Sequence, residues 1–130
     1  IPPTILSSAG LEKPEYMRGN PLQKISSSTP TPDWPDDVYI QISESHTGRS
    51  IRTNKWKYSV RAPNLDGNAE FSPLYEEDFL YDIENDPNEK NNLITDAKFA
   101  KVRNEMRERL YRRMRQANEP PAEIIEKKYK

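Results

Sequence analysis

The stretch between Asp96 and Asn118 constrains the fold more than any other part of the sequence. Its apolar side chains recur at steps of three or four residues and form one stripe along a helix: Phe99, Val102, Met106, Leu110 and Met114. Thr95 or Asp96 can cap the start of this helix, and a pair of prolines at 120 and 121 stops it. Such a helix needs a second layer to cover its stripe.

Short alternating segments earlier in the chain provide that layer. Residues 38–43 alternate in polarity, and residues 49–53 and 56–61 do so on either side of a tight link at 54–55. Residues 78–82 are aromatic and branched, which suits a further strand. The sequence therefore predicts an α+β fold, with a small antiparallel sheet of about four strands and one long C-terminal amphipathic helix packed on it.

The remaining segments are less regular. Residues 2–9 can form two helical turns that end at Gly10, and residues 12–36 carry five prolines, which predicts an irregular, extended connection. Residues 118–130 form a charged tail in which Ile124 and Ile125 can dock locally. The chain starts at Ile1 rather than at a methionine, so we expect a fragment or a processed product.

Composition excludes several classes of function. Only 33% of the residues are hydrophobic, so the core is small and the domain is marginal unless a neighbour covers its apolar surface. A net charge of -1 gives no electrostatic reason to expect nucleic acid or an anionic membrane as partner, and no apolar run is long enough to span a bilayer. The absence of cysteine excludes disulfides and thiol catalysis.

No residue pattern in the chain resembles a catalytic centre. His46 is the single histidine, and in its loop it can bind an anion, shuttle protons or be merely solvated or structural. Ser43 and Ser45 lie near it, but neither stands in a Gly-x-Ser-x-Gly elbow. The acids at 82, 84 and 86 match the start of a calcium loop, yet Pro87 and Leu93 replace its required glycine and glutamate. We therefore assign no catalytic residue and no metal ligand to the chain.

Basic residues concentrate in the predicted hairpin, at positions 49, 52, 55, 57 and 61, with Trp56 and Tyr58 between them. Alternation places Arg49 with Ile51, and it places Lys57 opposite to Trp56 and Tyr58. Basic and aromatic side chains therefore need not share a surface. The pattern fits phosphate or base binding and equally a solvated sheet face.

Three stretches together resemble the C-terminal portion of a sulfatase of the alkaline-phosphatase superfamily. The first is Pro3-Thr4-Ile5-Leu6 with Ala9-Gly10, Pro14 and Met17-Arg18-Gly19. The second is the hairpin Arg49-Ser50-Ile51-Arg52-Thr53-Asn54-Lys55-Trp56-Lys57-Tyr58. The third is Leu80-Tyr81-Asp82-Ile83-Glu84-Asn85-Asp86-Pro87-Asn88-Glu89 with Asn92-Leu93, followed by a helix. Residues 20–22 depart from the serine-leucine ending usual after the first stretch.

The resemblance implies a parent enzyme that hydrolyses sulfate esters with Ca²⁺ and a formylglycine, both outside this segment. It implies that residues 1–36 are the tail end of the large catalytic domain plus an extended linker, that residues 37–117 are the C-terminal subdomain, and that residues 118–130 are a charged tail. The expected partners are the chain's own N-terminal catalytic domain and a sulfated small molecule or glycan. The family implies a periplasmic, secreted or lysosome-like compartment.

Within that frame the candidates for substrate contact are His46, Arg49 and Arg52, because a loop beside a basic strand can reach a cleft and bind carboxylate or sulfate. Two other interpretations stay open. The chain can be a stand-alone interaction module that uses its basic hairpin or its apolar helix face, or it can be the equivalent end of a related phosphatase or phosphonate hydrolase. Separated from a large domain, the chain should self-associate through its exposed apolar patch.

Overall fold

The computed structural model describes residues 1–26 and 34–127, and the chain divides into two compact units, Ile1–Pro35 and Asp36–Lys130. The first unit holds the helix α1, Pro2–Ser8, which begins with prolines and is followed by Gly10 at a φ of 70°. A short helix, α2, spans Gln23–Ser26 inside the stretch predicted to be irregular. Part of that stretch, residues 27–33, lies outside the described residues.

The second unit is built on a five-stranded sheet with the order β1-β2-β3-β4-β5. Its strands are β1 (Val38–Ile42), β2 (Gly48–Arg52), β3 (Trp56–Arg61), β4 (Leu74–Asp82) and β5 (Glu123–Ile125). The first four are the predicted antiparallel strands, although β4 begins four residues earlier than the aromatic segment. The fifth pairs in parallel with β4 and lies in the segment expected to be a charged tail.

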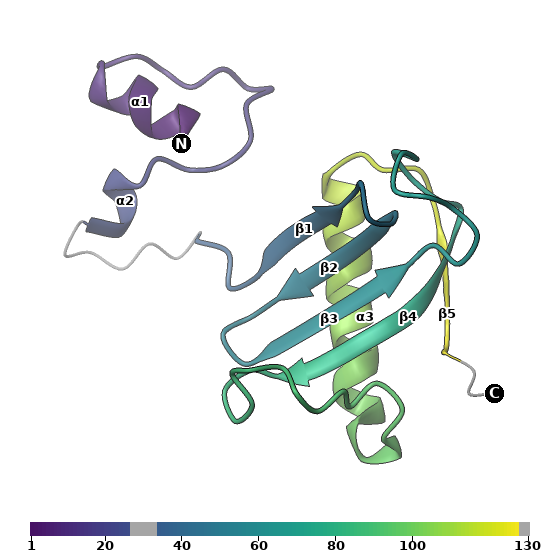
Figure 1. The fold of residues 1–130 in the computed structure, drawn as a ribbon. Coiled ribbons are helices and arrows are strands. Elements are labelled where there is room, and N and C mark those ends of the chain that lie inside the picture. Colours follow the sequence, from purple (N-terminus) through teal and green to yellow (C-terminus); the bar gives the residue numbers. More distant parts are fainter. Residues whose placement is uncertain (27–33, 128–130) are drawn as a thin grey trace. The chain divides into compact units, whose positions relative to one another are not determined.

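A 3-10 turn, η1 (Ala97–Phe99), leads into the long helix α3, Ala100–Gln116, which crosses one face of the sheet (Figure 1). Asp96 caps the turn by accepting a hydrogen bond from the amide of Lys98. The α3 side chains of Met106, Leu110 and Met114 are buried against the sheet. The predicted α+β class and the amphipathic C-terminal helix are therefore confirmed.

Cross-strand pairing separates the two faces of the sheet. One row, made of Tyr39, Ile51, Tyr58 and Leu80, packs into the core beneath α3. The next row, made of Ile40, Ser50, Ser59 and Phe79, lies on the face opposite to α3. The apolar side chains of β1 that the alternation grouped together thus point away from the helix, and Val38 is 59% exposed.

A buried carboxylate joins the start of β1 to α3. The Asp37 side chain, 1% exposed, forms ion pairs with three arginines of α3, at 3.4 Å to Arg109, 2.6 Å to Arg112 and 2.8 Å to Arg113. Arg113 also donates a hydrogen bond to the Asp37 carbonyl oxygen. The beginning of the second unit is therefore fixed to the C-terminal half of its helix.

Candidate functional site

Two loops meet at one end of the sheet and form the best-defined surface for a binding role. They are residues 43–47, between β1 and β2, and residues 63–72, between β3 and β4; we refer to them as the paired loops. The amide of Glu44 donates to the Gly67 carbonyl oxygen at 2.9 Å. The Thr47 hydroxyl lies 2.6 Å from the Asp66 carbonyl oxygen and 2.9 Å from that of Ala69. Buried groups thus hold both loops together.

Gly67 is the position at which this contact admits no side chain. A Cβ atom there would lie 2.1 Å from the carbonyl carbon and oxygen of Glu44, which is far inside van der Waals contact. Only glycine allows the two backbones to approach this closely. The sequence pattern alone did not reveal this packing role.

His46 lies on the first of the paired loops and is half-buried. Its Nδ1 atom is 3.0 Å from the Ser45 hydroxyl. A Cβ atom at Gly48 would come within 3.1 Å of the imidazole and 3.0 Å of the Val60 carbonyl oxygen, so that glycine makes room for the ring. The imidazole is therefore in contact with Ser45 and Gly48 and remains partly exposed.

Arg49 lies just behind this loop, and its side chain is only 2% exposed. Its Nε atom donates to both carboxylate oxygens of Glu119, at 2.8 and 2.9 Å. Its two terminal nitrogens donate to the carbonyl oxygens of Gly48, at 2.8 Å, and Glu70, at 2.6 Å. All three nitrogens of the guanidinium are therefore engaged within the second unit.

Glu119 is the residue of this cluster that sequence reasoning missed. Burial raises the pKa of its carboxyl, and hydrogen bonds from Tyr39, Gln41 and Arg49 outweigh that effect and lower it overall. Burial and the bond to Glu119 raise the pKa of the Tyr39 hydroxyl. The sequence contains one indication of such a partner. Strand alternation places Arg49 on the same face as Ile51, and a charged side chain on the core face of a sheet requires a partner of opposite charge.

Arg52 lies at the other end of β2, is exposed, and has no ion-pair partner in the described part of the chain. Four residues of strand separate it from Gly48, or about 13 Å at the rise of a β-strand. The structure therefore does not bring the three predicted residues together. His46 belongs to the paired loops, Arg49 lies behind them, and Arg52 stands apart.

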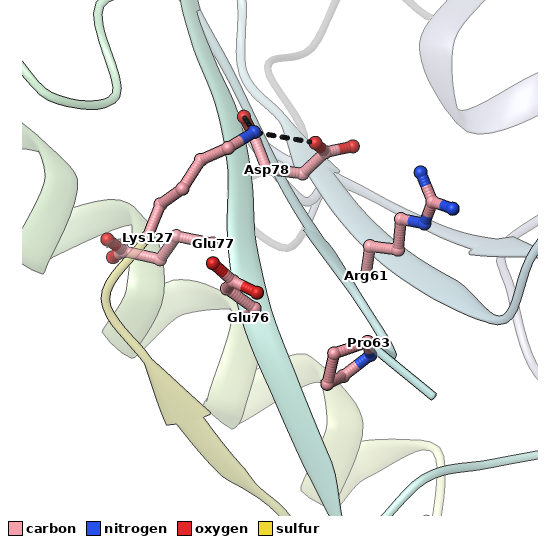
Figure 2. Close-up of a pocket in the computed structure, with 6 residues that line it drawn as sticks. All are labelled: Arg61, Pro63, Glu76, Glu77, Asp78 and Lys127. Carbon is pink, nitrogen blue, oxygen red and sulfur yellow. Dashed lines mark hydrogen bonds and ion pairs between the residues drawn. The ribbon is translucent and has the colours of Figure 1, made fainter. Parts of the chain in front are cut away.

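A shallow hollow of about 200 Å³ lies beside β4, lined by Arg61, Pro63, Glu76, Glu77, Asp78 and Lys127 (Figure 2). Lys127 reaches across it to the Asp78 carboxylate at 3.3 Å. Burial raises the pKa of Glu77, whose carboxylate accepts a hydrogen bond from Tyr58 and faces Arg103 and Arg107 at 3.6 Å. Three carboxylates and two cations line the hollow, and none of the described residues that border it is a histidine, serine or cysteine.

Among residues 1–26 and 34–127, no group of three acidic, histidine or cysteine side chains is arranged to hold a metal ion. The acidic turn after β4 is an Asx-type turn, in which Asp82 accepts hydrogen bonds from the amide and side chain of Asn85. No helix within those same ranges is long and apolar enough to cross a bilayer.

Comparisons with known proteins identify the relatives of this fold. The sequence profile of the family described as "N-sulphoglucosamine sulphohydrolase, C-terminal" matches residues 1–116. The chain is 30% identical over 123 residues to a protein of Escherichia coli (strain K12) named "Uncharacterized sulfatase YidJ", covering 91% of this chain and 22% of that protein.

Solved structures agree. One relative, determined in complex with its substrate D-glucosamine-2-N,6-O-disulfate, superposes with a TM-score of 0.73 at 26% identity, covering 89% of this chain and 23% of the other. A putative sulfatase from Bacteroides thetaiotaomicron gives a TM-score of 0.69 at 26% identity, covering 90% of this chain and 24% of the other. A 2-O GAG sulfatase gives 0.67 at 26% identity, with coverages of 89% and 24%.

The chain thus spans less than a quarter of the length of each of these relatives. The match begins at residue 1, includes the first four strands and ends with α3, so that β5 lies beyond it. The resemblance read from the three sequence stretches is confirmed. The chain belongs to the N-sulphoglucosamine sulphohydrolase C-terminal family and is a C-terminal sulfatase domain.

Proposed function

We propose that this chain serves an enzyme that hydrolyses sulfate esters of glucosamine-class saccharides, and that it supports the catalytic domain and borders the substrate cleft without supplying a catalytic group. The support for the reaction is the family, together with the sulfated glucosamine bound by one relative and the GAG sulfatase named for another. The sulfatase names of these relatives favour sulfate over phosphate as the group released.

The partner that we propose is the enzyme's own N-terminal catalytic domain. The first unit leaves large apolar side chains in solvent, with Ile1 84%, Ile5 63%, Leu11 60% and Tyr16 83% exposed. The sheet face opposite to α3 presents Val38, Ile40 and Phe79. Large apolar side chains exposed in this way suit burial against a larger neighbour, and we propose that role for both regions.

Under this proposal the Ca²⁺ ion and the formylglycine belong to that catalytic domain. A sulfuryl transfer needs a metal and a preorganised nucleophile, whereas binding energy from remote contacts orients the rest of the substrate. This chain would provide remote contacts alone. Its side chains would hold and orient the saccharide, and no proton transfer or nucleophilic attack would involve them.

The observation that carries the cleft assignment is the fixed pose of His46. The paired loops are joined by a backbone hydrogen bond and by two hydrogen bonds from the Thr47 hydroxyl. Because the loops are already ordered, binding of a saccharide to His46 would lose little conformational entropy. A partly exposed imidazole can donate a hydrogen bond to a sugar hydroxyl or accept one from it, and a protonated imidazole can bind sulfate. Contact with Arg52 as well would need an extended oligosaccharide, because the two side chains lie at opposite ends of β2.

The test is His46→Ala in the full-length enzyme, assayed with sulfated glucosamine. We expect KM to rise with little change in kcat, because a contact made equally in ground and transition states is lost. Arg52→Ala is the matched control, since it removes a charge from the far end of the same strand and should leave KM for a monosaccharide unchanged. Identical kinetics for His46→Ala and the wild type would refute the cleft assignment.

A further inference from the structure

Arg49 is a basic residue of the hairpin whose charge faces inward. Its side chain is almost fully buried beneath the paired loops, and its three nitrogens donate hydrogen bonds to Glu119, Gly48 and Glu70. A substrate sulfate could reach this guanidinium only by displacing Glu119, both of whose carboxylate oxygens accept from the Arg49 Nε atom. Arg49 is therefore poorly placed to touch a substrate.

We propose that Arg49 is a positioning residue that sets the paired loops, and through them His46, by linking both loops to the end of α3. The inference rests on the proposed function of the paired loops. It assigns to Arg49 a role in substrate affinity that it exerts through the backbone rather than by contact.

Glu119 is itself held in a fixed position. The helix α3 ends in a Schellman motif, in which Asn118 adopts a φ of 58° and the amide of Glu119 donates to the Met114 carbonyl oxygen at 3.1 Å. That turn directs the Glu119 side chain back to the sheet. There it accepts hydrogen bonds from the Tyr39 hydroxyl and from the Gln41 amide, the latter at 2.6 Å.

Arg49 connects Glu119 to both loops through hydrogen bonds. Through Glu70 it holds the end of the loop 63–72, and through the Gly48 carbonyl oxygen it holds the residue that follows the loop 43–47. The Thr47 hydroxyl binds the same long loop at Asp66 and Ala69. Thr47 and Arg49 thus satisfy three carbonyl oxygens of the loop 63–72, and Thr47 also neighbours His46 in sequence.

Position 49 requires a side chain that can donate hydrogen bonds in several directions. The acceptors are one carboxylate and two carbonyl oxygens that lie in different directions around the guanidinium. The planar guanidinium of arginine reaches all three acceptors. The ammonium of lysine is a compact charge on a shorter side chain and cannot reach all three at once. Arg49→Lys therefore keeps the charge and the ion pair with Glu119 but releases the carbonyl oxygen of Glu70.

The experiment uses the full-length enzyme with Arg49→Lys and Glu119→Gln as variants and Lys57→Arg as the control. Lys57 is a partly buried cation of the adjacent strand and pairs with Glu89 at 2.7 Å; within residues 1–26 and 34–127, no ion pair or hydrogen bond joins its side chain to the paired loops. We measure amide hydrogen exchange over residues 43–47 and 63–72, and kcat and KM for sulfated glucosamine and for a simple aryl sulfate.

The inference predicts faster exchange in both loops for Arg49→Lys and a KM for sulfated glucosamine raised by about tenfold, with kcat largely retained. The aryl sulfate, which lacks the saccharide, should show unchanged kinetics. Glu119→Gln should show the same pattern more weakly, because a neutral amide still accepts a hydrogen bond from Arg49. Lys57→Arg should match the wild type in every readout.

Two results separate this inference from the proposed function. Unchanged exchange in the paired loops of Arg49→Lys would overturn the inference, whatever His46→Ala does. Faster loop exchange with unchanged KM for sulfated glucosamine would overturn it too, because the loops would then have no part in affinity. A normal KM in His46→Ala would instead overturn the proposed function and the part of the inference that concerns His46, whereas loop exchange in Arg49→Lys would still test whether Arg49 holds the paired loops. If Arg49→Lys fails to fold, loop exchange and KM in Glu119→Gln decide the question by the same criteria.

Discussion

Replacing Asp37 by asparagine tests how the second unit is held together. The change keeps the shape of the side chain but removes the negative charge that Arg109, Arg112 and Arg113 share. The Asp37 carboxylate is 1% exposed, whereas the three arginines are 25%, 49% and 24% exposed. The change therefore removes the buried counter-charge of two partly exposed cations, Arg112 and Arg113, whereas Arg109 keeps its ion pair with Asp36.

The magnitude follows from that geometry. Removing one partner of a buried ion pair costs about 3 to 5 kcal/mol, and solvent at the arginines reduces this to about 2 to 3 kcal/mol. With a typical dependence on urea, the unfolding midpoint should fall by about 1 to 2 M. The neighbouring Asp36 is the matched control, because it is 68% exposed and pairs with Arg109 alone.

The assay is urea unfolding of the 130-residue chain, followed by circular dichroism, for the wild type, Asp37→Asn and Asp36→Asn. Asp36→Asn should cost at most about 1 kcal/mol, as surface ion pairs do. Adding Arg113→Met to Asp37→Asn should cost less than the sum of the two single changes, because the two residues share one interaction. Equal midpoints for the two asparagine variants would refute the reasoning.

Three further outcomes are expected. Leu110→Ala, at a fully buried α3 position, should lower the free energy of unfolding by about 2 to 5 kcal/mol, and exposed Glu108→Ala should change it by less than about 0.5 kcal/mol; urea midpoints check both. The pKa of the Glu119 carboxyl in the folded chain lies below its ordinary value of 4.5, so the stability that this carboxylate contributes is present above pH 4.5 and is lost as the pH falls through the folded pKa. Unfolding curves of Glu119→Gln should therefore show a smaller loss of stability in acid than those of the wild type. Parallel curves for the two proteins would contradict this. The isolated chain should self-associate through the apolar side chains of its first unit, and sedimentation that shows a monomer at all concentrations would argue against it.

The sequence predicted those elements whose periodicity extends over several residues. The stripe from Phe99 to Met114 defined α3, and alternation defined the first three strands, because a buried face repeats in each of them. It missed β5, since Glu123–Ile125 is too short to show a period and its pairing with β4 depends on contacts made far along the chain.

The site was harder to predict for the same physical reason. Arg49 and Glu119 are 70 residues apart, and nothing local to either residue reveals the other. Likewise Arg112 contacts Asp37, 75 residues away, and nothing near either residue indicates that pair. The sequence correctly placed His46 in a loop, but the second loop that fixes it is set by the Gly67 contact, which is a property of the folded backbone.

The central claim is that this chain supports a sulfatase whose chemistry lies elsewhere in the polypeptide. Release of inorganic sulfate from sulfated glucosamine, measured side by side for the full-length enzyme and for the purified 130-residue chain, tests it most directly. We predict turnover by the full-length enzyme and none above background by the chain. Sulfate release by the chain alone would contradict the account, as would a full-length protein inactive on sulfate esters.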